Sequence, residues 1–352
     1  MSERGHGGDI YKYQIKNKEE IIDFSANINP LGICEGVRAA LHEAIYMVHN
    51  YPDPNHRKLK QAISEYEDVS KEQIVCGNGA ADIIFRLVYS RKPKKALLLA
   101  PTFSEYEEAL KSIDCEIIYY RLKEENEFEF KENIVKIIDK TFDMVWICNP
   151  NNPTGKVASS SILQSILDEC EKKDILLVID ECFNDFLDNP EEYSLKNKID
   201  SPNLLILKAF TKMYAIPGVR LGYAMSDPNI IKQIEKTGQA WSVSGIAQHV
   251  GCAAVKETAY VQKTRSVIKK ERIYLEEELR SIGFKVYSSK ANYILFKSYH
   301  KIDLMKKLQD YNILIRSCEN YNELDETYYR IAVRTEKENK ILIDTLKQIC
   351  LK

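Results

Sequence analysis

The segment 175–181 reads ILLVIDE, a continuous apolar run that ends in two acidic residues. Six further apolar runs surround it in the chain: IVCG (74–77), ALLLAP (96–101), EIIYY (116–120), MVWICNP (144–150), LLILKAF (204–210) and RLGYAM (220–225). Amphipathic stretches such as SILQSILDECEKK (161–173) separate several of these runs. This alternation is typical of an α/β fold, a parallel sheet with helices on both faces. Ligands of such sheets bind beyond the carboxyl ends of the strands, so we expect the chemistry in the loops there.

The pattern changes after about residue 230. A charged amphipathic stretch (256–282) ends at Gly283, a helix stop signal. Shorter elements follow: ANYILF (291–296), DLMKKLQDY (303–311), ILIRS (313–317), YYRIAVR (328–334) and a final helix. They predict a smaller α+β domain. The expected division is an N-terminal arm with part of the small domain (1–45), a large domain (46–235) and a small C-terminal domain (236–352).

Composition excludes several classes of protein. The 352 residues are 44% hydrophobic and 29% charged, with a formal net charge of −2, which argues against a mainly disordered chain and a broad nucleic-acid surface. No apolar stretch approaches the ~20 residues that span a bilayer, and MSERGHGGDIYKYQ is too polar for a secretory signal. The nine cysteines are scattered and never spaced as CxxC, which predicts a reduced cytoplasmic protein with no disulfide framework and no metal.

Three loop residues could carry chemistry. Lys212 follows an apolar run; it is either a solvated surface lysine or an amine that traps a carbonyl group. Asp180 lies at the end of the strand-like run ILLVIDE, where a buried carboxylate needs a positive partner, unless it caps the next helix. Asn152 lies in NPNNPTG (149–155), which on its own could be only a turn. The residues alone leave these alternatives open.

The loops are more specific as an ordered set. GNGAAD (77–82), PTFSEY (101–106), NPNNPTG, VIDECFNDF (178–186) and TK (211–212), with Arg220 eight residues later, each follow a strand-like run. In this order they resemble the fold type I pyridoxal-phosphate enzymes, the aspartate aminotransferase superfamily, over essentially the whole chain. The resemblance implies pyridoxal 5'-phosphate as cofactor, and a large domain with a mostly parallel seven-stranded sheet beside a smaller α+β domain.

The resemblance also implies a role for each matching residue. Lys212 would bind the cofactor aldehyde and then move protons, Asp180 would keep the pyridine nitrogen protonated, and Asn152 would donate to the phenolic oxygen. Phe103 would stack on the ring with Tyr106 nearby. The remaining residues would hold the cofactor phosphate, by backbone amides at a helix start and by side chains: Gly79, Ala80, Ala81, Thr211, Arg220 and, from a neighbouring subunit, Tyr51. The active site would then be shared across a homodimer.

Three positions depart from the superfamily pattern. Ala209 stands where many relatives have a phosphate-binding serine, and Ala81 lacks the polar side chain often found there. The phosphate would therefore depend more on backbone amides, Thr211, Arg220 and Tyr51. Phe183 replaces a tyrosine that lies near the phenolic oxygen in many aminotransferases, so one hydrogen bond to the ring would be missing.

The ends of the chain narrow the resemblance. HGGD (6–9), DFSANINPLG (23–32), QAWSVS (239–244), ILIRSCENY (313–321) and YYRIAVR are similar to the threonine-phosphate decarboxylases of cobalamin biosynthesis, which in turn resemble histidinol-phosphate aminotransferases. Arg330 would grip the α-carboxylate and Arg316 the phosphate, unless both are ordinary surface or interface ion pairs. Further residues would close over the substrate: His6, Gly7, Asn27 and Asn152. His6 could equally be a frayed terminus.

The expected function is decarboxylation of O-phospho-L-threonine to (R)-1-aminopropan-2-yl phosphate by a cytoplasmic homodimer. Decarboxylation and transamination differ in which bond at Cα lies perpendicular to the cofactor ring, and the sequence does not show that angle; the choice rests on the resemblance. Three alternatives remain: an O-phospho-L-serine decarboxylase that gives ethanolamine phosphate, a histidinol-phosphate aminotransferase, and a non-enzymatic cofactor-binding regulator. The last is disfavoured because Lys212 is retained and no DNA-binding domain is appended.

Overall fold

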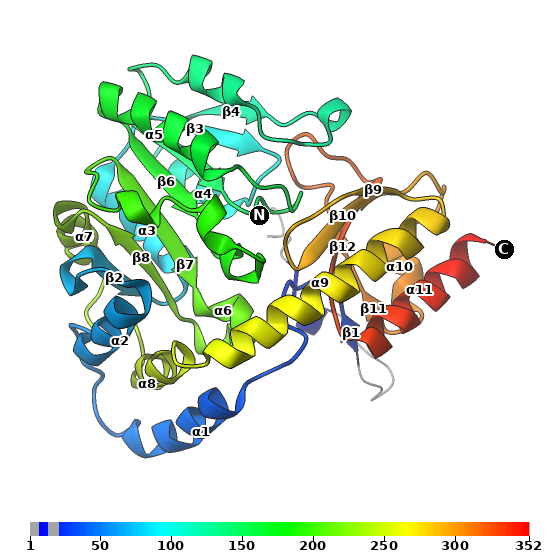
Figure 1. Ribbon diagram of the computed structural model, residues 1–352, viewed down its shortest axis with the longest axis horizontal. Helices are drawn as coiled ribbons and strands as arrows, with labels where there is room; N and C mark the ends of the chain where they lie inside the picture. The colour runs from blue at the N-terminus through cyan, green and yellow to red at the C-terminus, as the bar shows by residue number, and fades with distance from the viewer. Residues whose placement is uncertain (1–6, 13–20, 352) are drawn as a thin grey trace.

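The computed structural model describes residues 7–12 and 21–351, and a seven-stranded sheet forms its larger part (Figure 1). The strand order is β2-β8-β7-β6-β5-β3-β4. All seven apolar runs form its strands: β2 (Ile74–Gly77), β3 (Lys95–Ala100), β4 (Glu116–Arg121), β5 (Met144–Cys148), β6 (Leu176–Asp180), β7 (Leu204–Ala209) and β8 (Gly222–Ser226). Six strands run in one direction, and β8 alone runs in the opposite direction, antiparallel to β2 and β7. The expected mostly parallel α/β sheet is confirmed.

Helices cover both faces of this sheet. The alternation along β6 shows the two faces, because Val178 belongs to one buried cluster and Ile179 to the other. Apolar side chains of three helices pack with Val178: α3 (Ala80–Arg91), α4 (Glu105–Lys111) and α7 (Pro228–Glu235). Three others pack with Ile179: α2 (Arg57–Glu67), α5 (Ser160–Lys173) and α8 (Gly245–Ala254). Burial on both faces explains why the central strands β5, β6 and β7 are almost continuously apolar.

A second, antiparallel sheet lies beside the first. Its order is β12 (Arg316–Ser317), β13 (Tyr328–Ala332), β10 (Tyr293–Lys297) and β9 (Lys285–Tyr287). The helices α10 (Leu304–Gln309) and α11 (Glu336–Cys350) accompany it. The strand expected at 313–317 is divided, because β11 (Ile313–Leu314) pairs instead with β1 (Ile22–Asp23). The sequence thus predicted the α+β character but missed β9 and this division.

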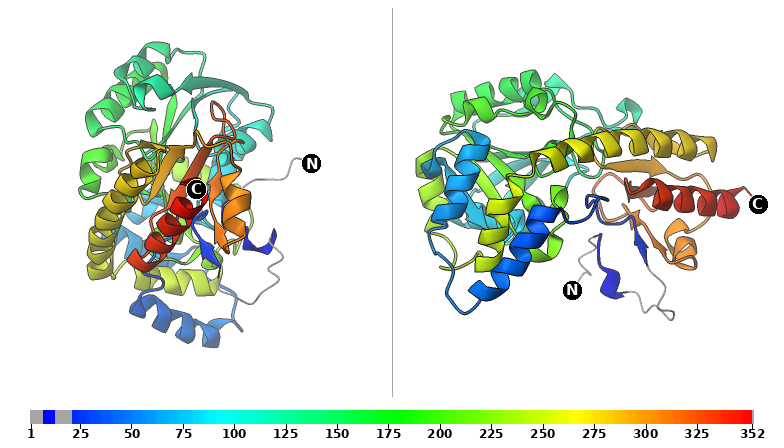
Figure 2. Two further views of the ribbon diagram at one scale, coloured as in Figure 1. Left: turned by 90° about the vertical axis from the view of Figure 1, so that its right-hand side faces the viewer. Right: turned by 60° about the horizontal axis from the view of Figure 1, so that its bottom comes forward.

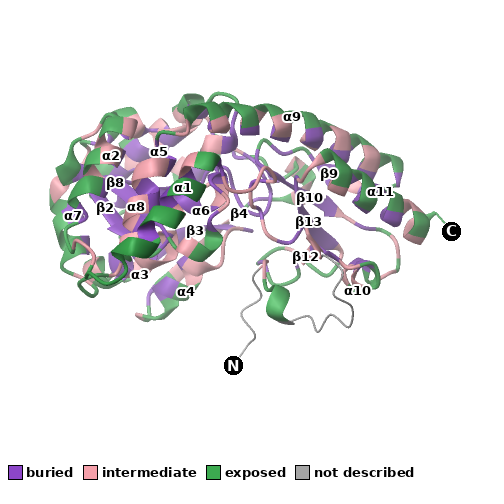
Figure 3. Ribbon diagram, turned by 90° about the horizontal axis from the view of Figure 1, so that it is seen from below, coloured by how far each residue is buried: buried purple, intermediate pink, exposed green. Residues whose placement is uncertain are grey.

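One long helix connects the two sheets. Helix α9 (Thr258–Ser281) runs from beside α8 to lie along α11 and the second sheet (Figures 1 and 2). It ends before Gly283, whose φ of +98° is a conformation that glycine adopts readily. Helix α1 (Glu35–Ala44) packs against α8. In the view from below, the strands of both sheets are mostly buried, while the outer side of α9 is exposed (Figure 3).

The site is positioned by the ends of the central strands. Asp180 is the last residue of β6, Asn149 follows β5, and the short helix α6 (Phe210–Met213) follows β7. Because β5, β6 and β7 are parallel, these loops meet at one edge of the sheet. None of the helices in the described ranges has the length and apolar character needed to cross a membrane.

Candidate active site

A cavity of about 450 Å³ lies at this edge, with walls from both sheets and from the segment before α1. Twelve of the predicted site residues line it: Gly7, Asn27, Ala80, Ala81, Phe103, Asn152, Asp180, Thr211, Lys212, Arg220, Arg316 and Arg330. Tyr106, Phe183 and Ala209 line it as well. The structure therefore brings together residues that are up to 323 positions apart, from Gly7 to Arg330.

Lys212 lies on α6 and points into this cavity rather than into open solvent. Its pKa is lowered to about 8, first by desolvation and then by the positive charge of Arg330. Its ammonium lies 5.9 Å from the centre of the Phe183 ring. An amine that loses its proton near neutral pH can act as a nucleophile or a base, as a carbonyl-trapping lysine must. The alternative of a solvated surface lysine does not fit this position.

Asp180 is a buried carboxylate with two hydrogen-bond donors. The Tyr106 hydroxyl donates to Oδ2 at 2.5 Å, and the Cys182 backbone N–H donates to Oδ1 at 2.9 Å. Burial raises the pKa of Asp180, and these donors oppose that shift. The bond to Cys182 closes a local turn; the next helical turn, Asn184–Phe186, is preceded by Phe183, so Asp180 is not its cap. A cationic ligand nitrogen would be a favourable partner for this carboxylate.

Arg316 and Arg330 are direct cross-strand partners in β12 and β13. Side chains opposite each other in an antiparallel pair share one face, and two like charges there are destabilising without a counterion. Arg330 is 5% exposed, and its recorded acceptors are neutral: Asn152 Oδ1, the Tyr321 hydroxyl at 3.3 Å and the Ser25 carbonyl at 2.8 Å. Its Nε has no hydrogen-bond partner among the described residues. The neutral acceptors and the unpartnered Nε leave Arg330 with hydrogen-bonding capacity for an anionic ligand in the cavity.

A second positive wall lies at the N-terminus of α3. Gly79, the N-cap, has a φ of +84°, and a Cβ there would lie 2.6 Å from Nη2 of Arg220. Glycine thus lets the Arg220 guanidinium approach the helix end, where backbone N–H groups attract anions. Ala80, Ala81 and Thr211 line the cavity beside it. These groups fit the phosphate of pyridoxal phosphate, while Lys212 and Asp180 fit its aldehyde and its ring nitrogen.

Some predicted residues are not brought to the cavity. Tyr51 is 83% exposed and packs on Trp241, with ring centres 5.0 Å apart. Gly79 shapes the approach of Arg220 without lining the cavity itself. His6 lies outside the described residues.

Sequence reasoning gave no role to several residues that line the cavity: Ser25, Ala26, Glu105, Cys148, Cys182 and Tyr321. Each lies inside or beside a motif quoted above, such as DFSANINPLG or ILIRSCENY. Their proximity to the motifs was the only signal. Which of them faces the ligand depends on the packing of one sheet against the other.

Comparisons with known proteins identify the family of this chain. The family model for aminotransferase class I and II matches residues 19–346. The chain is 35% identical to the threonine-phosphate decarboxylase of Salmonella typhimurium, over 98% of this chain and 96% of that protein. It is 30% identical to the histidinol-phosphate aminotransferase of Methanosphaera stadtmanae, over 94% and 91%. The crystal structure of the histidinol-phosphate aminotransferase from Clostridium acetobutylicum is similar with a TM-score of 0.87 and 32% identity, covering 94% of this chain and 99% of that one.

Proposed function

Since the chain belongs to the class I and II aminotransferase family, we propose that it is a pyridoxal-phosphate-dependent carboxy-lyase that acts on O-phospho-L-threonine. One observation carries the substrate class: Arg316 and Arg330 lie opposite each other and line the cavity that Lys212 enters. Two neighbouring guanidinium groups suit a substrate with two anionic ends. Phosphothreonine has a carboxylate and a phosphate, whereas histidinol phosphate has only the phosphate. The 35% identity to a threonine-phosphate decarboxylase supports the same choice.

The cofactor would be held at both ends. Lys212 would bind it covalently, Asp180 would face its ring nitrogen, Asn152 would donate to its phenolic oxygen and Phe103 would cover its ring. Its phosphate would lie against Ala80, Ala81, Thr211 and Arg220. Bound in this way, pyridoxal phosphate supplies an electron sink for a bond that breaks at Cα.

The protein groups would then orient the substrate and move its protons. Arg330 would bind the carboxylate and Arg316 the phosphate, with Gly7 and Asn27 beside them. Fixing both ends sets the angle of the carboxylate to the ring, and such orientation contributes on the order of several kcal/mol to a rate. Lys212 in its ammonium form would give a proton to Cα after CO₂ leaves and would become the neutral amine. The product, (R)-1-aminopropan-2-yl phosphate, would supply the linker of the cobalamin nucleotide loop.

The decisive experiment is product analysis of the holoenzyme with three substrates. O-phospho-L-threonine should release CO₂ without forming a 2-oxo acid, and Lys212→Ala should abolish this, while Lys236→Ala, at an exposed position, should not. Faster turnover of O-phospho-L-serine would instead indicate an ethanolamine-phosphate product. Glutamate formation from histidinol phosphate and 2-oxoglutarate, with no CO₂ release from either phosphoamino acid, would refute the proposal in favour of the aminotransferase.

The proposed enzyme is a cytoplasmic homodimer with shared active sites. An apolar surface patch supports a second copy of this chain as partner, because its side chains are 42–83% exposed: Ile45, Tyr46, Met47, Val48, Tyr51 and Trp241. Tyr51 belongs to this patch and would reach the cofactor phosphate of the neighbouring subunit. Sedimentation should give twice the chain mass of 40.7 kDa. Mixing Tyr51→Ala with Lys212→Ala chains should restore activity to one site per mixed dimer; a monomer, or no restoration, would contradict a shared site.

A further inference from the structure

Tyr321 contacts both arginines of the cross-strand pair. It lies in the loop that joins β12 to β13 and is 8% exposed. Its hydroxyl accepts a hydrogen bond from Nη1 of Arg330 at 3.3 Å and lies 3.4 Å from Asn152 Oδ1, to which it donates. Its ring centre lies 5.6 Å from the Cζ of Arg316. One side chain therefore touches Arg330 through its polar end and Arg316 through its aromatic face.

Both sheets fix the position of this loop. Within the loop, the Tyr321 backbone N–H donates to the Cys318 carbonyl at 3.0 Å. Across the cleft, Asn322 donates to Glu107 of α4 at 3.0 Å, and Glu323 pairs with Arg121 of β4 at 3.3 Å. Tyr321 is thus held at the junction of the two sheets, where the arginines from the second sheet face the cavity of the first.

The chemistry of a phenol suits this place. A neutral ring face attracts a guanidinium, and it places apolar bulk next to Arg316. The hydroxyl accepts from Nη1 of Arg330, and the Tyr293 ring lies 5.7 Å from the Cζ of Arg330 as a further support. The two like charges are thereby given different neighbours, so they present separate faces to a ligand.

We propose that Tyr321 is a positioning residue that assigns the two anions of the substrate to different arginines. Its hydroxyl orients Arg330 for the carboxylate, and its ring orients Arg316 for the phosphate. This inference rests on the proposed function for the identity of the substrate. It goes beyond that function in naming the group that separates the two anion sites and hence sets which end of the substrate binds where.

Two substitutions at one position separate the two contacts. Tyr321→Phe removes only the hydroxyl, and Tyr321→Leu also removes the ring. The control is Tyr328→Phe. Tyr328 is a buried residue of β13 that donates a hydrogen bond to Glu124 and does not line the cavity. The probes are O-phospho-L-threonine as substrate and ethanolamine phosphate, which lacks a carboxylate, as a competitive ligand.

The expected pattern is selective. Tyr321→Phe should raise the KM for phosphothreonine roughly three- to tenfold, the range for one lost hydrogen bond, with ethanolamine phosphate binding changed less than twofold. Tyr321→Leu should weaken both ligands, and Tyr328→Phe neither. If Tyr321→Phe weakens both ligands equally, or changes neither, the inference is wrong.

Failure of the proposed function gives a different result. In that case the wild-type enzyme releases no CO₂ from phosphothreonine. The same two ligands can then be titrated against the absorbance of the bound cofactor to obtain dissociation constants. A selective loss of phosphothreonine affinity in Tyr321→Phe would uphold the role of Tyr321 in the absence of that reaction, and an unselective result or unchanged affinities would overturn it.

Discussion

Tyr106 donates its hydroxyl hydrogen to Asp180 at 2.5 Å, so the carboxylate at the end of β6 is oriented from a neighbouring helix. The Tyr106 ring is in turn stacked on Trp146 of β5, with ring centres 5.1 Å apart. Both rings are 1% exposed. The contact stabilises the charged form of an acid whose pKa burial raises, and Asp180 would act in that form on a protonated ligand nitrogen.

Replacing Tyr106 by Phe should therefore weaken cofactor binding. A hydrogen bond to a charged group contributes about 1.5–3 kcal/mol, so we expect the dissociation constant of pyridoxal phosphate to rise at least about tenfold. Absorbance titration of the apoprotein measures it. Tyr120→Phe removes a hydrogen bond to Asn133 near the surface and serves as control. Equal affinities in wild type and Tyr106→Phe would show that this hydroxyl does not support the Asp180 carboxylate.

The pKa of Lys212 predicts a pH dependence for cofactor attachment. With a pKa of about 8 in place of the ordinary 10.5, the amine is mostly protonated at pH 7 and mostly neutral at pH 9. The rate at which apoprotein binds the aldehyde, trapped by borohydride, should rise with pH with a midpoint near 8. Lys212→Ala supplies the background from other lysines. In Arg330→Gln the midpoint should move upward because a nearby positive charge is lost; a midpoint near 10 in the wild type would contradict the shift.

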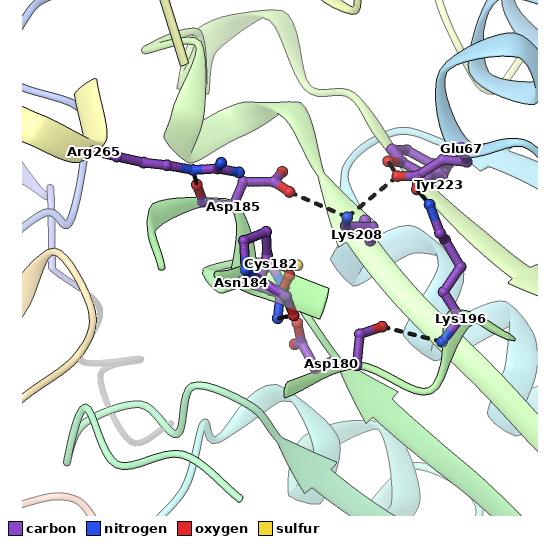
Figure 4. Close-up of polar contacts among 11 residues, drawn as sticks. Glu67, Asp180, Cys182, Asn184, Asp185, Lys196, Lys208, Tyr223 and Arg265 are labelled. Atoms are coloured by element: carbon purple, nitrogen blue, oxygen red, sulfur yellow. Dashed lines mark hydrogen bonds and ion pairs between the residues drawn. The ribbon is translucent and has the colours of Figure 1, made fainter. Parts of the chain in front are cut away.

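A buried charge cluster lies on the face of β6 and β7 that carries Ile179 and Ile206, opposite the face of Val178. Lys208 is within 3.1 Å of Asp185 and 3.2 Å of Glu67, and its side chain is 8% exposed (Figure 4). Glu67 also accepts hydrogen bonds from Tyr223 and Lys196. Because Asp185 follows β6 and Glu67 ends α2, the cluster ties helix α2 to the strand ends that carry Asp180 and Lys212.

Removing the cation should leave these acids without adequate compensation. Breaking a buried pair typically costs about 3–5 kcal/mol, so we expect Lys208→Met to lower the free energy of unfolding by about that amount. Lys196→Met is the matched control: its side chain is 39% exposed, and we expect a loss of about 1 kcal/mol or less. Urea unfolding at pH 7 measures both. Similar losses in the two variants would contradict the argument.

Most of the fold follows from continuous apolar runs, and the exceptions have physical causes. All seven runs became strands. In six of them nearly every residue is buried, because both faces of the sheet are covered there and polar alternation is removed; the edge strand β4 has no fully buried residue. Strand β9 was missed because it has only three residues, KVY, and begins with a lysine. The run 313–317 was expected as one strand, but its two ends pair with different partners, β1 and β13.

The candidate site also has a part that the sequence predicted and a part that it did not. The meeting of Lys212, Asp180 and Asn152 in one cavity was predictable because each lies at or just after the end of a strand that is visible in the sequence. The register that places Arg316 opposite Arg330 was not, since it depends on the length of the loop between β12 and β13. Tyr321 was missed for the same reason: its contact with Arg330 depends on the path of that loop, and its contact with Asn152 forms only where the loop meets the large sheet.

Glu181, the residue after Asp180, faces the charge cluster. Its titration predicts how the stability of the protein varies with pH. It is 1% exposed, its Oε1 has no hydrogen-bond partner among the described residues, and burial raises its pKa to about 7, against the attraction of Lys208 and a hydrogen bond from Ser194. The unfolded chain loses this proton near pH 4.5 and the folded protein near pH 7. Between these values the folded state binds more protons, so this group makes stability fall as pH rises.

Glu181→Gln removes that titration while keeping the shape of the side chain. Relative to wild type, the variant should therefore gain stability between pH 5 and pH 8, by up to about 3 kcal/mol if the whole shift is realised. Urea unfolding of each protein at pH 5 and at pH 8 gives the change in its free energy of unfolding between the two values. The changes of the variant and the wild type are then compared. Glu277→Gln, at an exposed position, should keep the same difference from wild type at both pH values. If Glu181→Gln behaves like Glu277→Gln, the carboxyl is already ionised at pH 5 and the cluster compensates its charge.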